Sequence, residues 1–191
     1  MAICIRKRGA AKDRVDDLTQ DFFLQLMQKS FFRRADPVQG RFRTFILTSL
    51  QNFLVDDARK NGRQKRGGHL TREELDDDSA STEFDDTQFD QAWAELIFER
   101  ALERVASETS KKRGAEAWEQ LRAFLPGGDP NRTYNDAADL LGMSEGGVKT
   151  EVFRLRKRFR DALRGEVGRT VDAPHEIDEE LAYLRSALAV Q

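Results

Sequence analysis

The feature that most constrains the fold is the regular spacing of apolar residues between residues 144 and 166. Val148, Val152, Leu155 and Phe159 recur at spacings of four, three and four residues, the period of one face of an α-helix. Lys and Arg occupy many of the positions outside this stripe. The pattern predicts a long amphipathic helix with a buried apolar face and a strongly basic outer face.

A shorter helix is predicted directly before the long one. Thr133 lies three residues ahead of Asp136, the spacing in which a threonine side chain caps the first turn of a helix. This helix should end at Leu141, because Gly142 readily adopts the left-handed conformation that stops a helix. Ser144 is then the expected N-cap of the long helix.

Two helices joined by such a tight turn are typical of a helix-turn-helix unit, whose second helix has the width to enter the major groove of DNA. Exposed residues in its first turns can reach base edges, and cations further along can contact phosphates. The competing interpretation is an ordinary helical hairpin with a solvated basic face. The small Ala137–Ala138 pair and the glycine in the turn favour the DNA-binding unit.

Helical periodicity extends over most of the chain, and no segment longer than a few residues alternates like a strand. Further helices are expected at about 13–29, 41–61, 88–107, 115–125 and around 177–188. We therefore predict an all-α protein with two small helical domains. The expected divisions are a first helical domain (1–66) whose first helix is incomplete, an acidic flexible linker (67–90), a helix-turn-helix domain (91–169) and an amphipathic C-terminal extension (170–191).

Charge is distributed very unevenly along the chain, although the whole sums to a net charge of −2. Counted by segment, residues 1–66 carry +8, residues 67–110 carry −10, residues 111–169 carry +4 and residues 170–191 carry −4. Two basic segments separated by an acidic one suit a polyanionic partner that is contacted at two places. The alternative is the ordinary blockiness of a highly charged helical protein.

The sequence argues against an enzyme. His69 and His175 are isolated in polar segments, and no Ser/His/Asp set, phosphate-binding loop or metal-ligand spacing is present. The one cysteine, Cys4, excludes a disulfide framework. No apolar run reaches the length of a membrane span. We expect a cytoplasmic protein that needs no cofactor or metal and does not insert into a membrane.

Three segments resemble bacterial sigma factors of the extracytoplasmic-function (ECF), sigma-70-like type. The run Asn-Asp-Ala-Ala-Asp-Leu-Leu-Gly-Met-Ser-Glu-Gly-Gly-Val-Lys-Thr at 135–150, followed by Arg-Leu-Arg-Lys-Arg at 154–158, resembles region 4, which reads the minus-thirty-five promoter element. Asp-Asp-Leu-Thr-Gln-Asp-Phe-Phe at 16–23 resembles the region 2 helix that binds core RNA polymerase. Arg-Phe-Arg-Thr-Phe-Ile-Leu at 41–47, with Asn52 and Asp56, resembles the segment that melts and reads the minus-ten element.

The resemblance covers about residues 3–66 and 91–166, in the family's order, and implies three sets of site residues. Those implied to face core polymerase are Asp17, Gln20 and Asp21. Those implied at minus-ten DNA are Asp36, Gln39, Arg43, Asn52, Arg59, Lys60 and Arg63. Those implied at minus-thirty-five DNA are Ser144, Lys149, Thr150, Glu151, Phe153, Arg154 and Lys157. For most of these polar residues the alternative interpretation is a solvated helix face.

Two residues of the long helix depart from the commoner residues of the family. Glu151 and Phe153 stand where a basic residue and a histidine are more usual, and we expect both to be exposed in the part of the helix that meets DNA. A carboxylate can accept a hydrogen bond from a cytosine amino group, and a phenylalanine can touch a thymine methyl group. The promoter sequence that they would read is therefore an unusual one.

The function implied by the resemblance is that of a sigma factor, which binds core RNA polymerase, recognises the minus-ten and minus-thirty-five elements and directs transcription initiation. Its expected partners are core polymerase and promoter DNA, with an anti-sigma factor or another regulatory protein as a further partner. The alternative is a stand-alone helix-turn-helix regulator that does not join core polymerase. Such a regulator has no reason to carry the helix of Asp17 and Gln20 together with the segment 41–56.

Overall fold

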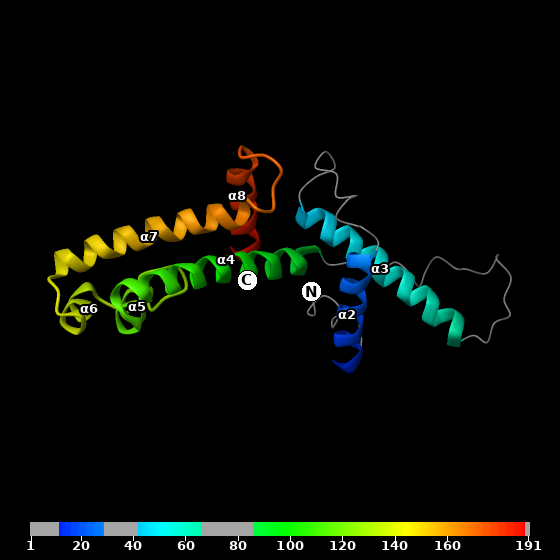
Figure 1. Cartoon of the computed structure of the whole chain (residues 1–191), viewed down its shortest axis with the longest axis horizontal. Helices are drawn as coiled ribbons and strands as arrows, with labels where there is room; N and C mark the ends of the chain where they lie inside the picture. The colour runs from blue at the N-terminus through cyan, green and yellow to red at the C-terminus, as the bar shows by residue number, and fades with distance from the viewer. Residues whose placement is uncertain (1–11, 29–41, 66–85, 190–191) are drawn as a thin grey trace. The chain divides into compact units, whose positions relative to one another are not determined.

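The computed structural model describes residues 12–28, 42–65 and 86–189, and every regular element in these ranges is an α-helix (Figure 1). The helices are α2 (Lys12–Gln28), α3 (Phe42–Lys65), α4 (Asp86–Arg113), α5 (Ala115–Arg122), α6 (Tyr134–Leu141), α7 (Glu145–Val167) and α8 (Glu176–Ala189). The predicted all-α fold class is confirmed. α4 begins inside the segment that we expected to be a linker up to residue 90, and the rest of that segment, 67–85, lies outside the described residues.

The chain divides into two compact units, which we describe separately. The first unit contains residues 1–94, 170–172 and 183–191, and the second contains residues 95–169 and 173–182. The first turns of α4 and the last turns of α8 therefore belong to the first unit, while the remainder of both helices belongs to the second.

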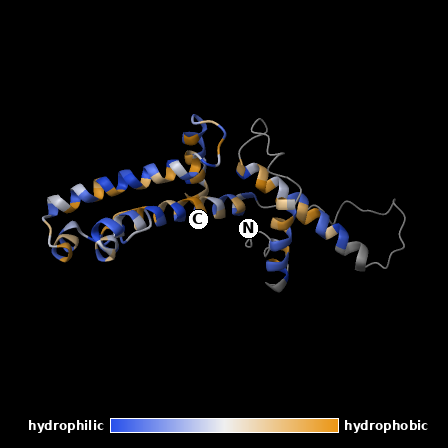
Figure 2. Ribbon diagram, viewed as in Figure 1, coloured by the Kyte–Doolittle hydropathy of each residue, from blue (hydrophilic) through white to orange (hydrophobic). Residues whose placement is uncertain are grey.

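The core of the first unit is formed by the apolar faces of α2 and α3 together with the start of α4. Its buried residues are Val15, Leu18, Phe22, Leu26, Ile46, Leu47, Leu50, Leu54 and Phe89. Figure 2 shows hydrophobic residues recurring along α2 and α3, as the spacing of three and four residues requires. The rings of Phe22 and Phe53 meet edge to face with their centroids 5.5 Å apart, and this contact packs α2 against α3.

The core of the second unit is formed by four helices, α4 to α7. Its buried residues are Ala101, Val105, Trp118, Leu121, Leu125, Ala137, Ala138, Val148, Val152, Leu155, Phe159 and Ala162. All four residues of the predicted apolar stripe on the long helix are among them. Phe98 of α4 packs edge to face on Phe159 of α7, with ring centroids 5.2 Å apart. α4 therefore forms the long support on which the basic helix α7 lies.

The loop between α5 and α6 is held by close local contacts. A side chain on Gly128 would place its Cβ 2.2 Å from the carbonyl oxygen of Ala123, so only glycine fits there. The ring of Phe124 stacks on that of Tyr134 at a centroid distance of 4.7 Å and an interplanar angle of 7°. Arg156 of α7 donates from Nε to the Phe124 carbonyl at 3.0 Å. These contacts fix where α6 begins.

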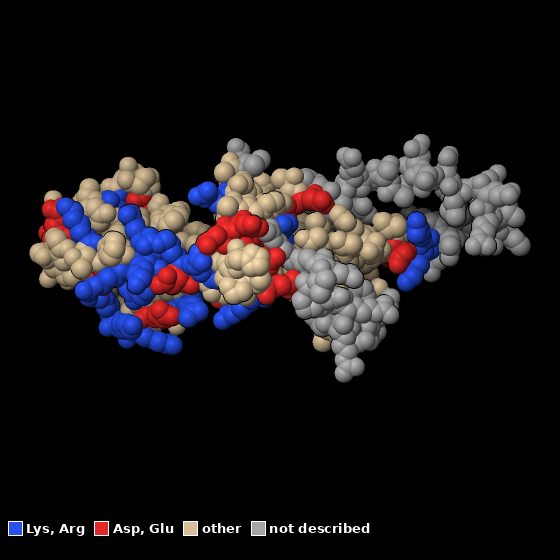
Figure 3. Space-filling view, turned by 90° about the horizontal axis from the view of Figure 1, so that it is seen from above, with Lys and Arg blue, Asp and Glu red and all other residues tan. Residues whose placement is uncertain are grey.

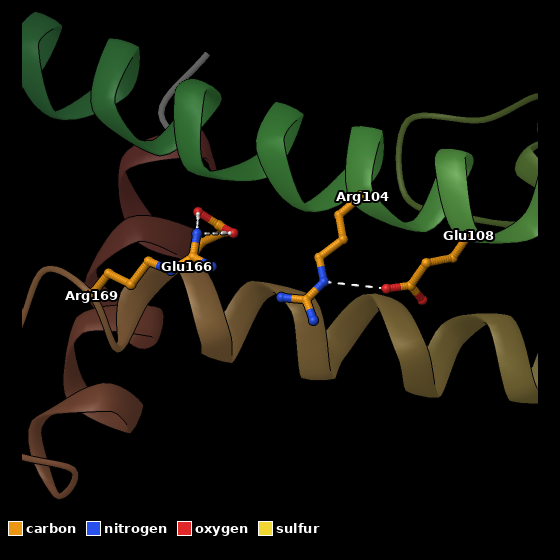
Figure 4. Close-up of polar contacts among 4 residues, drawn as sticks. All are labelled: Arg104, Glu108, Glu166 and Arg169. Atoms are coloured by element: carbon orange, nitrogen blue, oxygen red, sulfur yellow. Dashed lines mark hydrogen bonds and ion pairs between the residues drawn. The ribbon is translucent and has the colours of Figure 1, made fainter.

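The expected C-terminal helix is present as α8, and its first turns pack on the end of α7 in the second unit. Arg164 of α7 forms an ion pair with Asp178 of α8, which holds the pKa of that carboxyl below its ordinary value. Close by, the buried Glu166 accepts two hydrogen bonds from Nη1 of Arg169, at 2.9 and 3.0 Å (Figure 4). Arg104 of α4 donates to Glu108 at 3.3 Å in the same view.

Candidate nucleic-acid interface

The first helix of the candidate DNA-binding unit, α6, is fixed by a reciprocal cap. The Asp136 amide donates to Oγ1 of Thr133 at 3.2 Å, and the Thr133 amide donates to Oδ2 of Asp136 at 3.1 Å. The side-chain and backbone hydrogen bonds from Thr133 also lower the pKa of the Asp136 carboxyl. The predicted cap is confirmed, and it sets the start of α6 together with the contacts of the preceding loop.

The turn between α6 and α7 has the geometry that the sequence predicts. Gly142 adopts φ 60° and ψ 35°, the left-handed conformation, and its amide donates to the Ala138 carbonyl. Ser144 follows in extended conformation and accepts from the Gly147 amide at 3.1 Å through Oγ. The predicted helix stop and the predicted N-cap are confirmed, so α6 and α7 together form a helix-turn-helix unit.

Most of the residues expected at minus-thirty-five DNA lie on the outer face of α7. Those that are exposed are Ser144, Lys149, Thr150, Phe153, Arg154 and Lys157. Phe153 is 67% exposed, which is unusual because large apolar side chains are normally buried in a core. Lys149 forms an ion pair with Glu145 at 2.5 Å and lies over the ring of Tyr134, and its pKa is raised, chiefly by the bond to Glu145.

The exposure expected for Glu151 is wrong. Glu151 is only 6% exposed, and its Oε1 lies 2.8 Å from Nη2 of Arg113 and 3.1 Å from Nη1 of Arg154. The spacing held a signal for this, because residue 151 follows Val148 by three positions and precedes Leu155 by four, which is the register of the buried stripe. Glu151 is therefore paired inside the unit and does not face a base.

Basic side chains from α4 and α7 line one pocket of about 430 Å³ in the second unit. The lining residues are Thr109, Lys112, Arg113, Glu151, Phe153, Arg154, Lys157 and Arg158. Five of these are cations and one is a carboxylate, so the lining carries a net charge of +4. Figure 3 shows Lys and Arg side chains gathered on the surface of the second unit. Sequence reasoning missed Lys112 and Arg113, because α4 is far from the motif in sequence.

The three residues expected to face core polymerase share the outer face of α2. Asp17, Gln20 and Asp21 are all exposed, and Gln20 and Asp21 follow Asp17 by three and four positions, so they lie on one face away from the buried stripe of that helix. Three large apolar side chains next to them are exposed as well: Phe23 at 44%, Leu24 at 53% and Met27 at 69%. None of these three was among the residues that the resemblance implied at this surface.

The residues expected at minus-ten DNA fall into three groups. Asn52, Arg59 and Lys60 are exposed on α3. Arg63 lies within α3 at a position where only the helical backbone is described, and Asp36 and Gln39 lie outside the described residues. Arg43 is buried, so its guanidinium does not lie on a surface that DNA could touch.

Arg43 instead belongs to a buried polar cluster in the first unit. Its Nη1 pairs with Oδ1 of Asp90 from α4, and the Tyr183 hydroxyl from α8 donates to Oδ2 of the same carboxylate. The guanidinium carbon also lies 4.3 Å from the centroid of the Tyr183 ring. The bond to Asp90, together with burial, raises the pKa of the Tyr183 hydroxyl. The available signal was the helical register, because Arg43 precedes the apolar Ile46, Leu47 and Leu50 by three, four and seven positions and so shares their buried face.

Comparison with known protein families decides the class of protein. The model of the ECF sigma factor family matches residues 7–165, which include most of both units. The chain belongs to the ECF sigma factor family. No curated protein and no solved structure matches it.

Membership of this family gives the sigma factor a role in transcription initiation, and the family is not one of enzymes. Within the described residues, no group of His, Cys, Asp and Glu is arranged to hold a metal ion. None of the described helices of the sigma factor has the apolar length that a bilayer crossing requires.

Proposed function

We propose that this sigma factor binds core RNA polymerase through the exposed face of α2 and recognises the minus-thirty-five promoter element through α7. The observation that carries the proposal is the capped helix-turn-helix unit, whose second helix exposes one face of its N-terminal half and carries cations on that face. A helix braced in this way can enter the major groove without further rearrangement.

At the minus-thirty-five element, the exposed side chains divide by chemistry. Thr150 and Phe153 suit contact with base edges, because a hydroxyl can donate or accept and a phenyl ring can touch a thymine methyl group. Lys149, Arg154 and Lys157 suit phosphates, which position the helix without reading sequence. Ser144 caps α7 from an exposed position, and serine hydroxyls are among the groups that contact DNA phosphates.

At the minus-ten element, Asn52 has the amide chemistry to read a base edge, and Arg59 and Lys60 suit phosphates. Asp36, Gln39 and Arg63 complete this part of the proposal. Arg43 is left out of it, because the guanidinium is buried with Asp90.

The proposed polymerase-binding surface combines charge and apolar area. Asp17, Gln20 and Asp21 give polar specificity, and Leu24 and Met27 give apolar surface that has no cover among the described residues. Neighbouring exposed apolar side chains of this size are typical of protein–protein interaction sites.

Run-off transcription tests the whole proposal. Core RNA polymerase and a library of genomic fragments should give transcripts from discrete start sites only when the full chain is added. Replacing Gln20 and Asp21 by Ala should reduce both the capture of core polymerase and the amount of transcript, while DNA binding by the chain alone stays unchanged. Glu116→Ala, which removes an exposed carboxylate from the second unit, is the matched control.

The same assay separates the alternative function. A chain that binds DNA but supports no core-dependent initiation would be a stand-alone helix-turn-helix regulator, and the polymerase-binding role of α2 would be wrong. A Gln20→Ala/Asp21→Ala variant that captures core polymerase as well as the wild type would refute the assigned face alone.

A further inference from the structure

One oxygen of a buried carboxylate lies beside guanidinium groups from two helices of the second unit. Oε1 of Glu151 is 2.8 Å from Nη2 of Arg113, the last residue of α4, and 3.1 Å from Nη1 of Arg154 on α7. The Glu151 side chain is 7% exposed, against 38% for Arg113 and 66% for Arg154. The carboxylate is enclosed, while both cations still face solvent.

The charges around this carboxylate do not balance. One carboxylate can cancel only one of the two guanidinium charges, and Lys112, Lys157 and Arg158 line the same pocket. The pocket therefore keeps a surplus of positive charge that attracts an anion. Guanidinium groups present a planar fork of donors that matches the oxygens of a phosphate, so a phosphate group is the anion that this lining suits best.

The Glu151 carboxylate also determines how the two arginines are arranged. Without it, two like charges on long side chains would repel each other and sample many rotamers. With it, the two guanidinium groups are held to the same oxygen before any ligand arrives. A ligand that binds to side chains already ordered loses less entropy than one that must order them.

We propose that Arg113 and Arg154 bind one backbone phosphate of promoter DNA between them and that Glu151 is the positioning residue that holds them in place. The inference rests on the DNA-binding part of the proposed function. It adds a DNA contact from α4, which lies outside the helix-turn-helix unit. In this proposal Glu151 acts by positioning the two arginines and does not itself contact a base.

Equilibrium binding of a mixed-sequence DNA duplex to the full chain tests this, because phosphate contacts do not depend on sequence. Binding is followed by fluorescence anisotropy over a range of salt concentrations. Arg113→Ala should weaken binding about tenfold, as expected for a lost charge-assisted hydrogen bond. The same substitution should lower the slope of log K against log salt by about 1. Arg122→Ala is the matched control, since it removes an exposed arginine of the same unit that lies outside the pocket.

Glu151→Ala gives the sharper result, because two explanations predict opposite signs. A carboxylate that merely lies near DNA repels phosphates, so its removal would tighten binding. If Glu151 positions the arginines, its removal should weaken binding about two- to tenfold, the effect of freeing one long side chain. In an Arg113→Ala/Arg154→Ala background the same substitution should no longer weaken binding. Circular dichroism of each variant verifies that the helices are retained.

Each outcome bears on a different statement. If the wild-type chain does not bind the duplex, the DNA-binding part of the proposed function fails and this inference fails with it. If the wild type binds and Arg113→Ala behaves like Arg122→Ala, only the α4 contact is refuted. If Glu151→Ala tightens binding in the otherwise wild-type chain, the positioning role is refuted.

Discussion

Two arginine–carboxylate sites, one in each unit, have the same chemistry but opposite exposure. In the first unit, the side chains of both Arg43 and Asp90 are buried, at 9% and 7% exposure. In the second unit, only the carboxylate of Glu151 is buried, whereas its arginine partners, Arg113 and Arg154, reach solvent. An ion pair with both members buried can contribute only to the structure of its unit. A pair with a buried anion and exposed cations can hold those cations ready for a ligand.

The difference also predicts how the two sites respond to the loss of one partner. Removing one member of a fully buried pair leaves a charge that neither water nor protein can neutralise. Removing a buried carboxylate that serves exposed arginines leaves cations that water can solvate. The same kind of substitution should therefore have a large effect on stability in the first unit and a small one in the second.

Asp90→Ala should have the largest effect. It removes the buried carboxylate that pairs with Arg43 and that accepts from the Tyr183 hydroxyl, so the first unit should lose about 3–5 kcal/mol of stability. Urea denaturation followed by the fluorescence of Trp93 measures this, in a Trp118→Phe background so that only the first unit reports. The double substitution Arg43→Met/Asp90→Leu is the control and should recover most of the loss. A loss below about 1 kcal/mol would mean that the pair is solvated.

Glu151→Ala should have a smaller effect on stability. Arg113 and Arg154 remain partly exposed, so the second unit should lose only about 1 kcal/mol. Denaturation followed by the fluorescence of Trp118, which is buried in that unit, measures it in a Trp93→Phe background. An effect as large as that of Asp90→Ala would remove the distinction between the two sites.

Asp90→Asn should have the smallest and most specific effect, a change in the pKa of Tyr183. Its pKa is raised above the ordinary 10.0, first by the hydrogen bond to Asp90 and then by burial. Because the folded-state pKa is the higher one, the contribution of this hydrogen bond is full below the unfolded value and is lost as pH rises through the folded value. Asp90→Asn should bring the pKa of Tyr183 back toward its ordinary value.

Ultraviolet absorbance of tyrosinate during an alkaline titration measures that change. Tyr134→Phe leaves Tyr183 as the sole tyrosine of the chain and removes the overlapping signal. If Tyr183 titrates identically with and without the Asp90→Asn substitution, the carboxylate is not its partner in solution.

The parts of the fold that depend on neighbouring residues could be predicted from the sequence. The cap at Thr133, the left-handed Gly142 and the cap at Ser144 each involve residues within a few positions of one another. The apolar stripe of α7 likewise follows from helical spacing alone. These features require no knowledge of what packs against them, because the local backbone geometry decides them.

The pairings between distant residues could not be predicted. Arg43 and Asp90 are 47 positions apart, and Asp90 and Tyr183 are 93 apart, so neither contact follows from any local pattern. We expected Arg43 at minus-ten DNA and Glu151 exposed at minus-thirty-five DNA, and both are buried against α4, whose partner residues are distant in sequence. Charged residues are the hardest to place from sequence, because a partner far along the chain decides whether they face solvent.

The bond between Arg113 and Glu151 also bears on how the promoter sequence read by such a protein can diverge. A change at position 151 alone would also release an arginine on another helix, so its effect on DNA binding would extend beyond α7. Thr150 and Phe153, the residues proposed to contact base edges, form no ion pair or hydrogen bond with α4 among the contacts of the second unit. Each of these two can mutate singly, so we expect new promoter preferences to arise at them first.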